Sequence, residues 1–341
     1  MKIIEIEKKA DKLELLNYSI TSLNWESPLG HLLGTSQLFE ENLGRLLREG
    51  TKNMKTKDAV FVLPSPFLFS SFFSLPDLPQ KTLTATISSE AKRYIPLTMD
   101  EVVITFKLFQ FRNPFEENQT RWLVFLVGIP KSLTRKLKLA ADLAGLNFKS
   151  GQAEFFTREP FFTLKTGAKQ QIDDSSQCSI AIDFGVGYSS LVLLCGSQVL
   201  FSKKLKFKLY DVIEHVSKLM GVSLDKSEEM LIQQGFNMPA EMKNLKESLE
   251  NHINLLSAEV EQEIKEIQEK FGFRVVKLYL SGGAVNIPGF LDYLKAPGSK
   301  INFLILNAFD YLQNVPQREM VLKKGPVFAG AVGACSKYFF D

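Results

Sequence analysis

The chain of 341 residues is 45% hydrophobic and 23% charged, which is typical of a soluble globular protein and excludes a disordered or fibrous one. At about 150 residues per domain, this length predicts two domains. The 41 basic and 38 acidic side chains give a net charge of +3, which is too small and too interspersed to indicate a nucleic-acid partner. Cys178, Cys195 and Cys335 stand apart without metal-binding spacing, and this pattern favours a reducing compartment.

The start of the chain predicts a hairpin, a helix and one buried strand. Residues 2–6 and 12–22 alternate apolar and polar side chains around a polar turn, as paired strands do. Ser36 is a suitable N-cap for a helix over 37–49, and the apolar run 59–63 (AVFVL) is a strand that a proline ends. Together these elements predict the beginning of an α/β domain.

A compact α/β module is expected after residue 75. Four prolines interrupt the most apolar stretch of the chain, residues 59–79, so the sequence predicts no direct insertion into a membrane. The expected elements of the module are a helix over 81–94, strands over 102–111 and 122–129, and a helix over 131–144.

A glycine-rich turn between two apolar strands is the strongest local signal of the second half. Residues 179–194 (SIAIDFGVGYSSLVLL) predict strand, tight turn and strand. Glycines let main-chain N–H groups converge on a phosphate, hydroxyls add donors, and an aspartate can hold hydrated Mg²⁺. An ordinary glycine-rich hairpin is the alternative, because a short G-x-G turn is a weak signal. The candidate ligands in this turn are Asp183, Gly185, Gly187, Tyr188, Ser189 and Ser190.

The rest of the chain predicts helices around a second glycine turn. Apolar residues recur every three or four positions over 239–270, which fits a coiled coil or a core helix, and the flanking strand patterns favour the core helix. A buried strand then leads into Ser281-Gly282-Gly283, where a flat ligand such as adenine could approach the backbone closely. A helix of small residues over 325–338 ends the pattern.

The order of these two turns, separated by helices and followed by an alanine- and glycine-rich helix, resembles the second half of an actin-like fold. Residues 75–103 narrow the resemblance to the PilM family of type IV pilus assembly proteins and its relative FtsA. They carry a leucine–proline entry and a helix that ends in a characteristic motif. The matching residues of that motif are Glu90, Ala91, Tyr94, Ile95 and Pro96.

This resemblance implies an α/β fold of the actin-like ATPase type, with two ribonuclease-H-like halves and an inserted small α/β subdomain. It divides the chain into residues 1–74 (first half), 75–147 (insert), 148–176 (return to the first half and linker), 177–324 (second half, with the long helix over 239–270) and 325–341 (C-terminal helix packing back on the first half).

The resemblance also implies a nucleotide site for ATP and Mg²⁺ between the halves. The turn at 183–190 is similar to the family's second phosphate loop, with Asp183 holding Mg²⁺ indirectly, and Glu228 lies on the helix that faces the ribose. The adenosine loop would consist of Ser281, Gly282, Gly283, Ala284 and Pro288.

A protein partner follows from the same resemblance. PilM-like proteins are cytoplasmic, lie at the inner membrane through partners, and grip the cytoplasmic tail of the membrane protein PilN beside the insert; pilus motor components are further candidate partners. The sequence leaves the oligomeric state open. The groove would be lined by Phe67, Phe69, Phe72, Leu83, Ile87 and Tyr94, although most phenylalanines in this stretch are expected to be core.

Two departures from the family pattern weaken the expected ATP site. The first phosphate loop and its strand have no counterpart, since Met1 to Glu5 align with the strand after it, and the first sheet is therefore expected to contain a gap. Leu231 stands where the family places a lysine. A late start of the sequence and a natural loss of nucleotide binding both explain these departures.

Three functions remain in competition. The first is a non-enzymatic adaptor that docks a PilN-like tail. The second is an active ATPase or small-molecule kinase, which needs a general base and a complete phosphate clamp that the sequence does not supply. The third is an FtsA-like filament protein of cell division, against which the short C-terminal end, KYFFD, counts.

Overall fold

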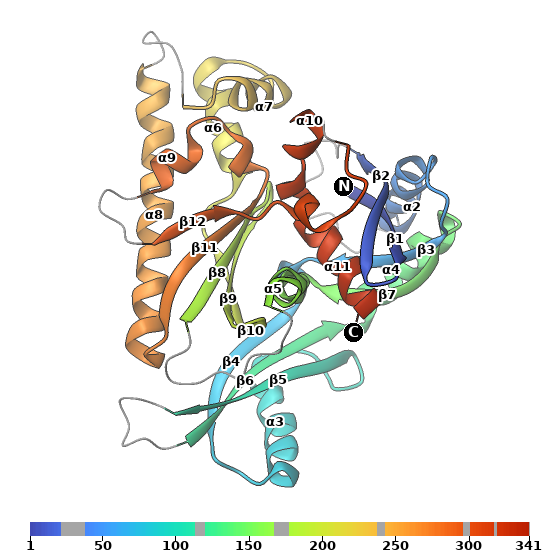
Figure 1. Ribbon diagram of the computed structural model, residues 1–341, viewed down its shortest axis with the longest axis vertical. Helices are drawn as coiled ribbons and strands as arrows, with labels where there is room; N and C mark the ends of the chain where they lie inside the picture. The colour runs from blue at the N-terminus through green and yellow to red at the C-terminus, as the bar shows by residue number, and fades with distance from the viewer. Residues whose placement is uncertain are drawn as a thin grey trace.

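The computed structural model describes residues 1–21, 38–112, 120–166, 177–236, 243–295, 301–316 and 319–340 (Figure 1). It has two α/β halves and a third, smaller α/β unit, which lies at the bottom of Figure 1. Within the described residues, no helix combines the length and the apolar character needed to cross a membrane.

The second half is built on a five-stranded sheet in the order β10-β9-β8-β11-β12. β9 and β10 run antiparallel to their neighbours, whereas β11 and β12 run parallel to β8. β8 and β9 are almost continuously apolar because both faces of the sheet are covered. The strands are β8 (Gln177–Phe184), β9 (Ser189–Cys195), β10 (Gln198–Leu205), β11 (Arg274–Gly282) and β12 (Asn302–Ile305).

Four helices accompany this sheet. They are α6 (Leu209–Met220), α7 (Leu224–Gln233), α8 (Lys243–Phe271) and α9 (Phe290–Leu294). One apolar stripe of α8, from Leu245 to Ile267, is buried in the same core as β8 and β11. The interpretation as a core helix is therefore confirmed, while the expected start at Pro239 lies outside the described residues.

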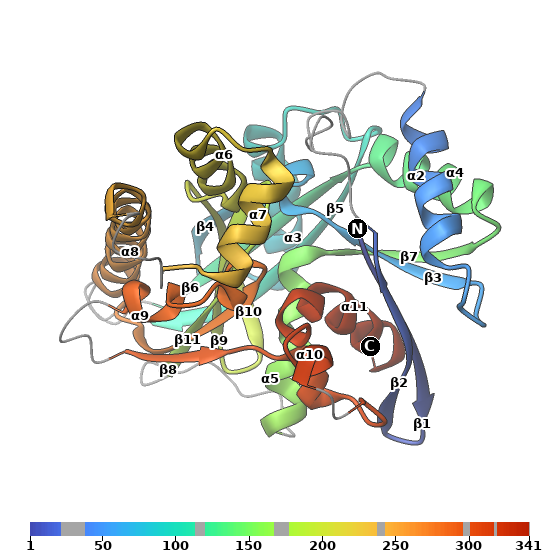
Figure 2. The same ribbon diagram turned by 90° about the horizontal axis from the view of Figure 1, so that it is seen from above.

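The sheet of the first half is in two parts. β1 (Lys2–Lys9) and β2 (Lys12–Ile20) form an antiparallel hairpin, and β3 (Asp58–Leu63) pairs in parallel with β7 (Asn147–Ala153). The two pairs are separate sheets, which confirms the expected gap. Figure 2 shows them diverging, with α11 beside both. The helices here are α2 (Leu38–Gly50), α4 (Lys131–Leu143) and α11 (Ala329–Phe340). α4, which was expected to belong to the insert, packs against α2 and β7.

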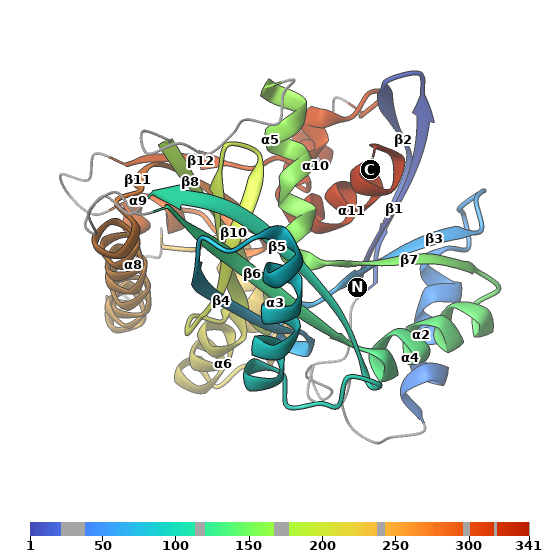
Figure 3. The same ribbon diagram turned by 90° about the horizontal axis from the view of Figure 1, so that it is seen from below.

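The insert contains a three-stranded antiparallel sheet in the order β4-β6-β5, with α3 over one face (Figure 3). Its sheet begins at Phe69, six residues before the expected boundary at 75, because β4 pairs along its length with β6. The other face meets the second half through Phe72 and Phe111, whose rings contact Phe271 at 5.2 and 6.1 Å. The elements are β4 (Phe69–Pro76), α3 (Gln80–Tyr94), β5 (Val102–Arg112) and β6 (Thr120–Pro130).

One buried carboxylate links three parts of the molecule. Glu159 begins α5 (Glu159–Thr166) and is only 6% exposed. It pairs with Lys107 of β5 and with Lys337 of α11, and it accepts a hydrogen bond from the Val199 N–H of β10 at 2.9 Å. Two cations and a main-chain donor compensate the buried charge, so this contact fixes the insert, the second half and the C-terminal helix together.

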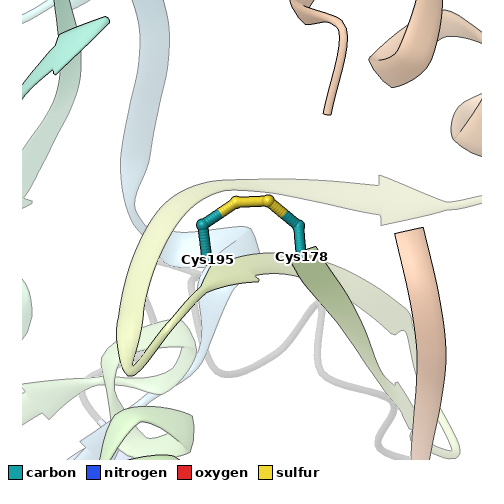
Figure 4. The surroundings of a disulfide bond; sticks show 2 residues. All are labelled: Cys178 and Cys195. Atoms are coloured by element: carbon teal, nitrogen blue, oxygen red, sulfur yellow. A yellow bond between two sulfur atoms is a disulfide. The ribbon is translucent and has the colours of Figure 1, made fainter. Parts of the chain in front are cut away.

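Two cysteines correct an expectation drawn from the sequence. Cys178 and Cys195, which were expected to stand apart as thiols, form a disulfide between β8 and β9 (Figure 4). They lie directly opposite each other in the antiparallel register, with Cα atoms 4.2 Å apart. Pairing across neighbouring strands cannot be seen from a separation of 17 residues, so sequence spacing alone missed it.

Short helical segments complete the chain. They are η1 (Ser65–Phe67), η2 (Glu154–Arg158), η4 (Ala284–Asn286), η5 (Ala308–Tyr311), α10 (Glu319–Leu322) and η6 (Gly325–Phe328). The expected helix over 37–49 is α2, whose proposed cap at Ser36 lies outside the described residues.

Candidate functional site

The structure brings the two glycine turns together. They follow the carboxyl ends of β8 and β11, which are neighbouring parallel strands. The Gly283 N–H donates to the Phe184 carbonyl at 2.9 Å. Gly282 has φ of +94°, and a side chain there would collide with the Phe184 carbonyl and the Asp183 carboxylate. Glycine is therefore required for the two turns to touch.

The first turn is held against the start of α6. The Leu209 N–H donates to the Gly185 carbonyl at 3.3 Å, and the Tyr210 N–H donates to the Val186 carbonyl at 2.9 Å. A Cβ at Gly185 would collide with the Tyr188 carbonyl, so this position also requires glycine. The turn is a fixed structure that exposes Val186 and leaves Gly185 and Gly187 on the wall of a cleft.

An arginine from the first half lies at the turn that the sequence analysis expected to bind phosphate. Arg158, at the end of η2, is 2% exposed and pairs through Nη2 with Oδ2 of Asp183. Its Nη1 donates to the Thr157 hydroxyl at 3.1 Å. This buried ion pair joins the two halves, because Asp183 ends β8 of the second half.

A second buried acid lies beside the pair. Glu154 accepts a hydrogen bond from the Ser65 N–H at 3.0 Å and another from the Tyr188 hydroxyl at 2.9 Å. Burial raises the pKa of Glu154, and the negative charge of Asp183 raises it further. Burial and the carboxylate of Glu154 likewise raise the pKa of the Tyr188 phenol well above its ordinary value. The protonated forms of both groups are thus favoured.

The cleft between the halves measures about 2750 Å³. The first turn, the second turn and α7 line it on one side, while β1, α2, β3 and α11 line it on the other. The residues of its wall that the sequence analysis had named as site residues or departures from the family pattern include Phe67, Asp183, Gly185, Gly187, Tyr188, Glu228, Leu231, Gly283 and Pro288.

Several expected phosphate ligands do not face this cleft. Ser189 is fully buried and Ser190 is 3% exposed, since both begin the buried strand β9. The Ser189 hydroxyl has no hydrogen-bond partner among the described residues. The hydroxyl donors expected from the sequence are therefore inside the fold, because successive side chains of β9 point to opposite faces and both faces are buried.

Only some residues of the expected adenosine loop line the cleft, and the others are buried. Ser281 is buried and donates to the Ile182 carbonyl at 3.3 Å, and Ala284 is fully buried. Gly283 and Pro288 do line the cleft, together with Glu228 of α7. Partial burial raises the pKa of Glu228, and the nearby Asp225 raises it further. Leu231 is 1% exposed and belongs to the core of the second half.

These positions test whether Mg·ATP fits. The glycine backbone and Pro288 leave an accessible wall on the adenosine side. On the phosphate side, the carboxylate of Asp183 already neutralises a guanidinium, so it is not available to a hydrated magnesium ion in this arrangement. The carboxylate that the resemblance implies would hold Mg²⁺ is thus engaged by Arg158.

The residues expected to line the groove for the PilN-like tail lie in different parts of the fold. Leu83 and Ile87 are 1% and 0% exposed on the buried face of α3, so they belong to the core of the insert. Phe72 packs against Phe201 and Phe271, at the contact with the second half.

The other three of the six expected groove residues lie at three further places. Phe67 lines the cleft, Phe69 is half-buried against the core under α3, and Tyr94 is 41% exposed and stacks on Phe73. The six therefore do not form one surface.

Arg158 and Glu154 are the functional candidates that sequence reasoning missed. Both come from the segment EFFTREP, where charged residues interrupt a run of phenylalanines. A charge inside an apolar segment is a signal of a buried, paired group, since an unpaired one would be too costly. The sequence could have raised this possibility, but it could not name Asp183 as the partner.

The fold and the cleft define the class of protein: an actin-like α/β fold with two halves around a cleft and an inserted subdomain. The model of the family described as type IV pilus assembly protein PilM matches residues 1–338. The chain belongs to the PilM family, which confirms the resemblance seen in its sequence.

One solved structure supports this fold. The chain is similar to a PilM–PilN type IV pilus biogenesis complex, with 19% identity and a TM-score of 0.75 over 98% of this chain and 94% of that chain. An archaeal actin homologue aligns with 13% identity and a TM-score of 0.44, over 98% and 82% of the two chains. An MreB of Spiroplasma citri bound to ADP aligns with 12% identity and a TM-score of 0.40, over 62% of this chain and 66% of that chain. No curated protein sequence matches the chain.

Proposed function

We propose that this protein is a non-enzymatic adaptor of a type IV pilus assembly platform, which binds the cytoplasmic tail of a PilN-like inner-membrane protein. Membership of the PilM family supports the pilus role, and the similar solved complex contains PilM together with PilN. On this proposal the protein is cytoplasmic and reaches the membrane through its partner.

One observation carries the proposal: the cleft has an apolar wall where the first half meets the insert. α2 and α4 pack closely there, since a Cβ at Gly44 would lie 2.9 Å from Leu143 Cβ. The wall, which we call the α2–α4 groove, consists of Phe39, Leu43, Leu46, Phe67, Leu133 and Leu137.

The groove suits a short tail that carries apolar side chains. Leu43 and Leu46 are only half-buried, so docked side chains would remove further apolar surface from water, worth about 25 cal/mol per Å². Lys136 lies 5.6 Å from the centre of the Phe39 ring and adds a cation at the edge of the groove. Apolar pockets with a charged rim are typical of peptide-binding surfaces.

Nucleotide hydrolysis has no part in this proposal. The Arg158–Asp183 pair occupies the phosphate end, and Ser189 and Ser190 point into the fold. We infer that binding of Mg·ATP is weak or lost, and that the scaffold serves partner binding alone. An active ATPase would require Asp183 to be released from Arg158.

The test is calorimetry of the full chain with a synthetic N-terminal peptide of a PilN-like protein, with and without 1:1 Mg·ATP. Leu46→Lys is expected to weaken peptide binding by about tenfold or more, because it places a charge in an apolar pocket. Leu139→Lys is the matched control, since Leu139 is 48% exposed on α4 and outside the cleft.

Peptide affinity should be the same with and without Mg·ATP. A folded chain that does not bind the peptide would overturn the adaptor role. Binding that needs Mg·ATP would instead support a nucleotide-switched protein.

A further inference from the structure

The outward side of α4 carries three positive charges that no acidic side chain compensates. Lys131, Arg135 and Lys138 follow one another at spacings of four and three residues, so they lie on one side of the helix. All three are exposed, and none forms an ion pair with any residue that the structure describes. Figures 2 and 3 show α4 beside α2 at the outer edge of the first half.

Exposed cations on several other helices are paired with an acid about one turn away. In α6, for example, Lys218 lies 2.8 Å from Glu214. Similar pairs occur on α3, α7 and α8. α4 has a single acidic residue, Asp142, and within the described part of the chain no ion pair joins it to Lys138 one turn earlier. The positive side of α4 is therefore exceptional in this molecule.

These cations do not stabilise the helix that carries them. The N-terminal end of a helix dipole is positive and favours acids. α4 nevertheless begins with Lys131 and has no acid in its first turn. Like charges one turn apart also repel each other, as Lys131 and Arg135 do. Because helix stability does not explain the three cations, they indicate a negatively charged surface that meets them from outside.

Two exposed leucines border the cations. Leu139 and Leu143 follow each other by one turn and are 48% and 45% exposed. Arg48 of α2 donates to the Leu143 carbonyl and adds a fourth cation beside them. Large apolar side chains next to cations are typical of surfaces that lie on membrane headgroups. We call the surface formed by Lys131, Arg135, Lys138, Leu139 and Leu143 the α4 outer face.

The inner side of the same helix belongs to the α2–α4 groove. Leu133 and Leu137 line that groove, and they are buried on the opposite side of α4 from the cations. On the proposed function, the groove holds the tail of a protein that is anchored in the inner membrane. A tail bound there would bring the neighbouring α4 outer face close to the lipid surface.

We propose that the α4 outer face binds the surface of a membrane that contains anionic phospholipids. Lipid phosphates attract the cations, and Leu139 and Leu143 enter the headgroup region. Each cation close to such a surface strengthens binding by about fivefold. Three or four cations give a weak and salt-sensitive contact, which suits a protein that a membrane partner also holds. The choice of a membrane as the occupant rests on the proposed function.

The test is sedimentation of the full chain with vesicles, in the absence of any PilN-like peptide. Mixed vesicles of phosphatidylglycerol and phosphatidylcholine should bind the protein, and high salt should release it. Vesicles of phosphatidylcholine alone should not bind it. The triple variant Lys131→Glu, Arg135→Glu, Lys138→Glu should bind the mixed vesicles about a hundredfold more weakly or worse, because three attractive charges are removed.

A second triple variant controls for net charge. Lys243→Glu, Lys265→Glu, Lys270→Glu makes the same change in charge on α8, and it should leave vesicle binding unchanged. Leu139→Gln keeps the charge and should weaken binding by about threefold or more, because less apolar surface leaves water.

The folding of the α4 variant is checked by urea unfolding. Acids at the start of α4 suit the helix dipole, so this variant is expected to fold. If it does not fold, Arg135→Gln alone takes its place and should bind about fivefold more weakly.

Four results would overturn the proposal: no binding of the folded chain to the mixed vesicles, unchanged binding by the α4 variant, an equal loss in the α8 variant, or unchanged binding by Leu139→Gln. Tighter binding of soluble polyglutamate than of the mixed vesicles would show instead that an acidic protein is the occupant. The vesicle experiment contains no tail peptide and the calorimetry contains no vesicles, so failure of the membrane contact and failure of the adaptor role are seen separately.

Discussion

At the scale of single residues, a group of buried charged side chains lies between the two halves, and no short sequence motif indicates it. Arg158 neutralises Asp183, while Glu154 accepts hydrogen bonds from Ser65 and Tyr188. With one cation and two acids enclosed together, the protein favours the neutral form of the acid that lacks a cationic partner of its own. Glu154 is therefore a source of pH-dependent stability.

The first prediction concerns Glu154→Gln. The pKa of Glu154 is raised in the folded state above its ordinary value of 4.5. Its contribution to the stability of the fold is therefore fully present below pH 4.5, and it is lost as the pH rises through the folded-state pKa. The native chain should lose stability from pH 4.5 upward at a slope of up to about 1.4 kcal/mol per pH unit, and Glu154→Gln should remove this slope. Urea unfolding at several pH values measures it.

Glu101→Gln is the control of opposite sign. Hydrogen bonds from the Thr98 side chain and N–H lower the pKa of exposed Glu101, so its contribution is present above 4.5 and fades as pH falls. If Glu154→Gln and the native chain lose stability in parallel with rising pH, the assignment of the slope to Glu154 is wrong.

At the scale of elements, aromatic side chains fix the insert on the second half. Phe72 and Phe111 come from β4 and β5. They meet Phe271 at the end of α8 and Phe273 just before β11. Edge-to-face ring pairs of this kind add to the burial of large apolar surfaces. Part of the chain's 28 phenylalanines is explained by this contact between units.

The second prediction concerns Phe111→Ala. Phe111 is 6% exposed and its ring lies 5.3 Å from that of Phe273, so truncation leaves a cavity between the insert and the second half. We expect a loss of about 3–5 kcal/mol in the free energy of unfolding. Val103→Ala on the same strand, where the side chain is 49% exposed, should change it by about 0.5 kcal/mol or less.

Denaturant unfolding of both variants, together with limited proteolysis of the insert, measures the effect at each of the two positions. Equal losses in Phe111→Ala and Val103→Ala would show that the aromatic contact does not hold the insert in place.

At the scale of the whole molecule, two buried ion clusters connect parts that are distant in the sequence. Arg158 joins the first half to Asp183 of the second, and Glu159 joins β5, β10 and α11. Both residues come from the short segment after β7, at the crossing between the halves. Movement of one half against the other would have to break these pairs, which favours a fixed scaffold for partner binding.

The third prediction concerns Arg158→Leu. Removing the guanidinium leaves buried acids without a counter-charge and should cost about 3–5 kcal/mol of stability. Adding Asp183→Asn to it should recover a large part of that loss, because the uncompensated charge is then removed as well. Arg93→Leu, which breaks an exposed pair with Glu90, should cost less than about 1 kcal/mol.

Chemical denaturation of the three variants tests the coupling. A double variant no more stable than Arg158→Leu alone would mean that the arginine acts through packing and not through its charge. In that case the phosphate end of the cleft would not be closed by an ion pair.

The sequence by itself determined the family, the most strongly patterned helices and strands, and the position of both glycine turns, but it did not predict β4, β7, β12 or α5. These features are local: periodicity, prolines, glycines and motif order are written along the chain, and α8 and β8 follow them directly. The gap beside β1 was also predictable, because the given sequence has no counterpart of the family's first strand and its phosphate loop.

Only the tertiary structure decided which side chains meet. It buried Ser189, Ser190, Leu83 and Ile87, and it joined Cys178 to Cys195. It also placed Arg158 against Asp183 across the two halves. The physical reason is that burial and charge pairing depend on contacts between distant segments, and a single sequence gives the residues available for pairing but not their partners in space.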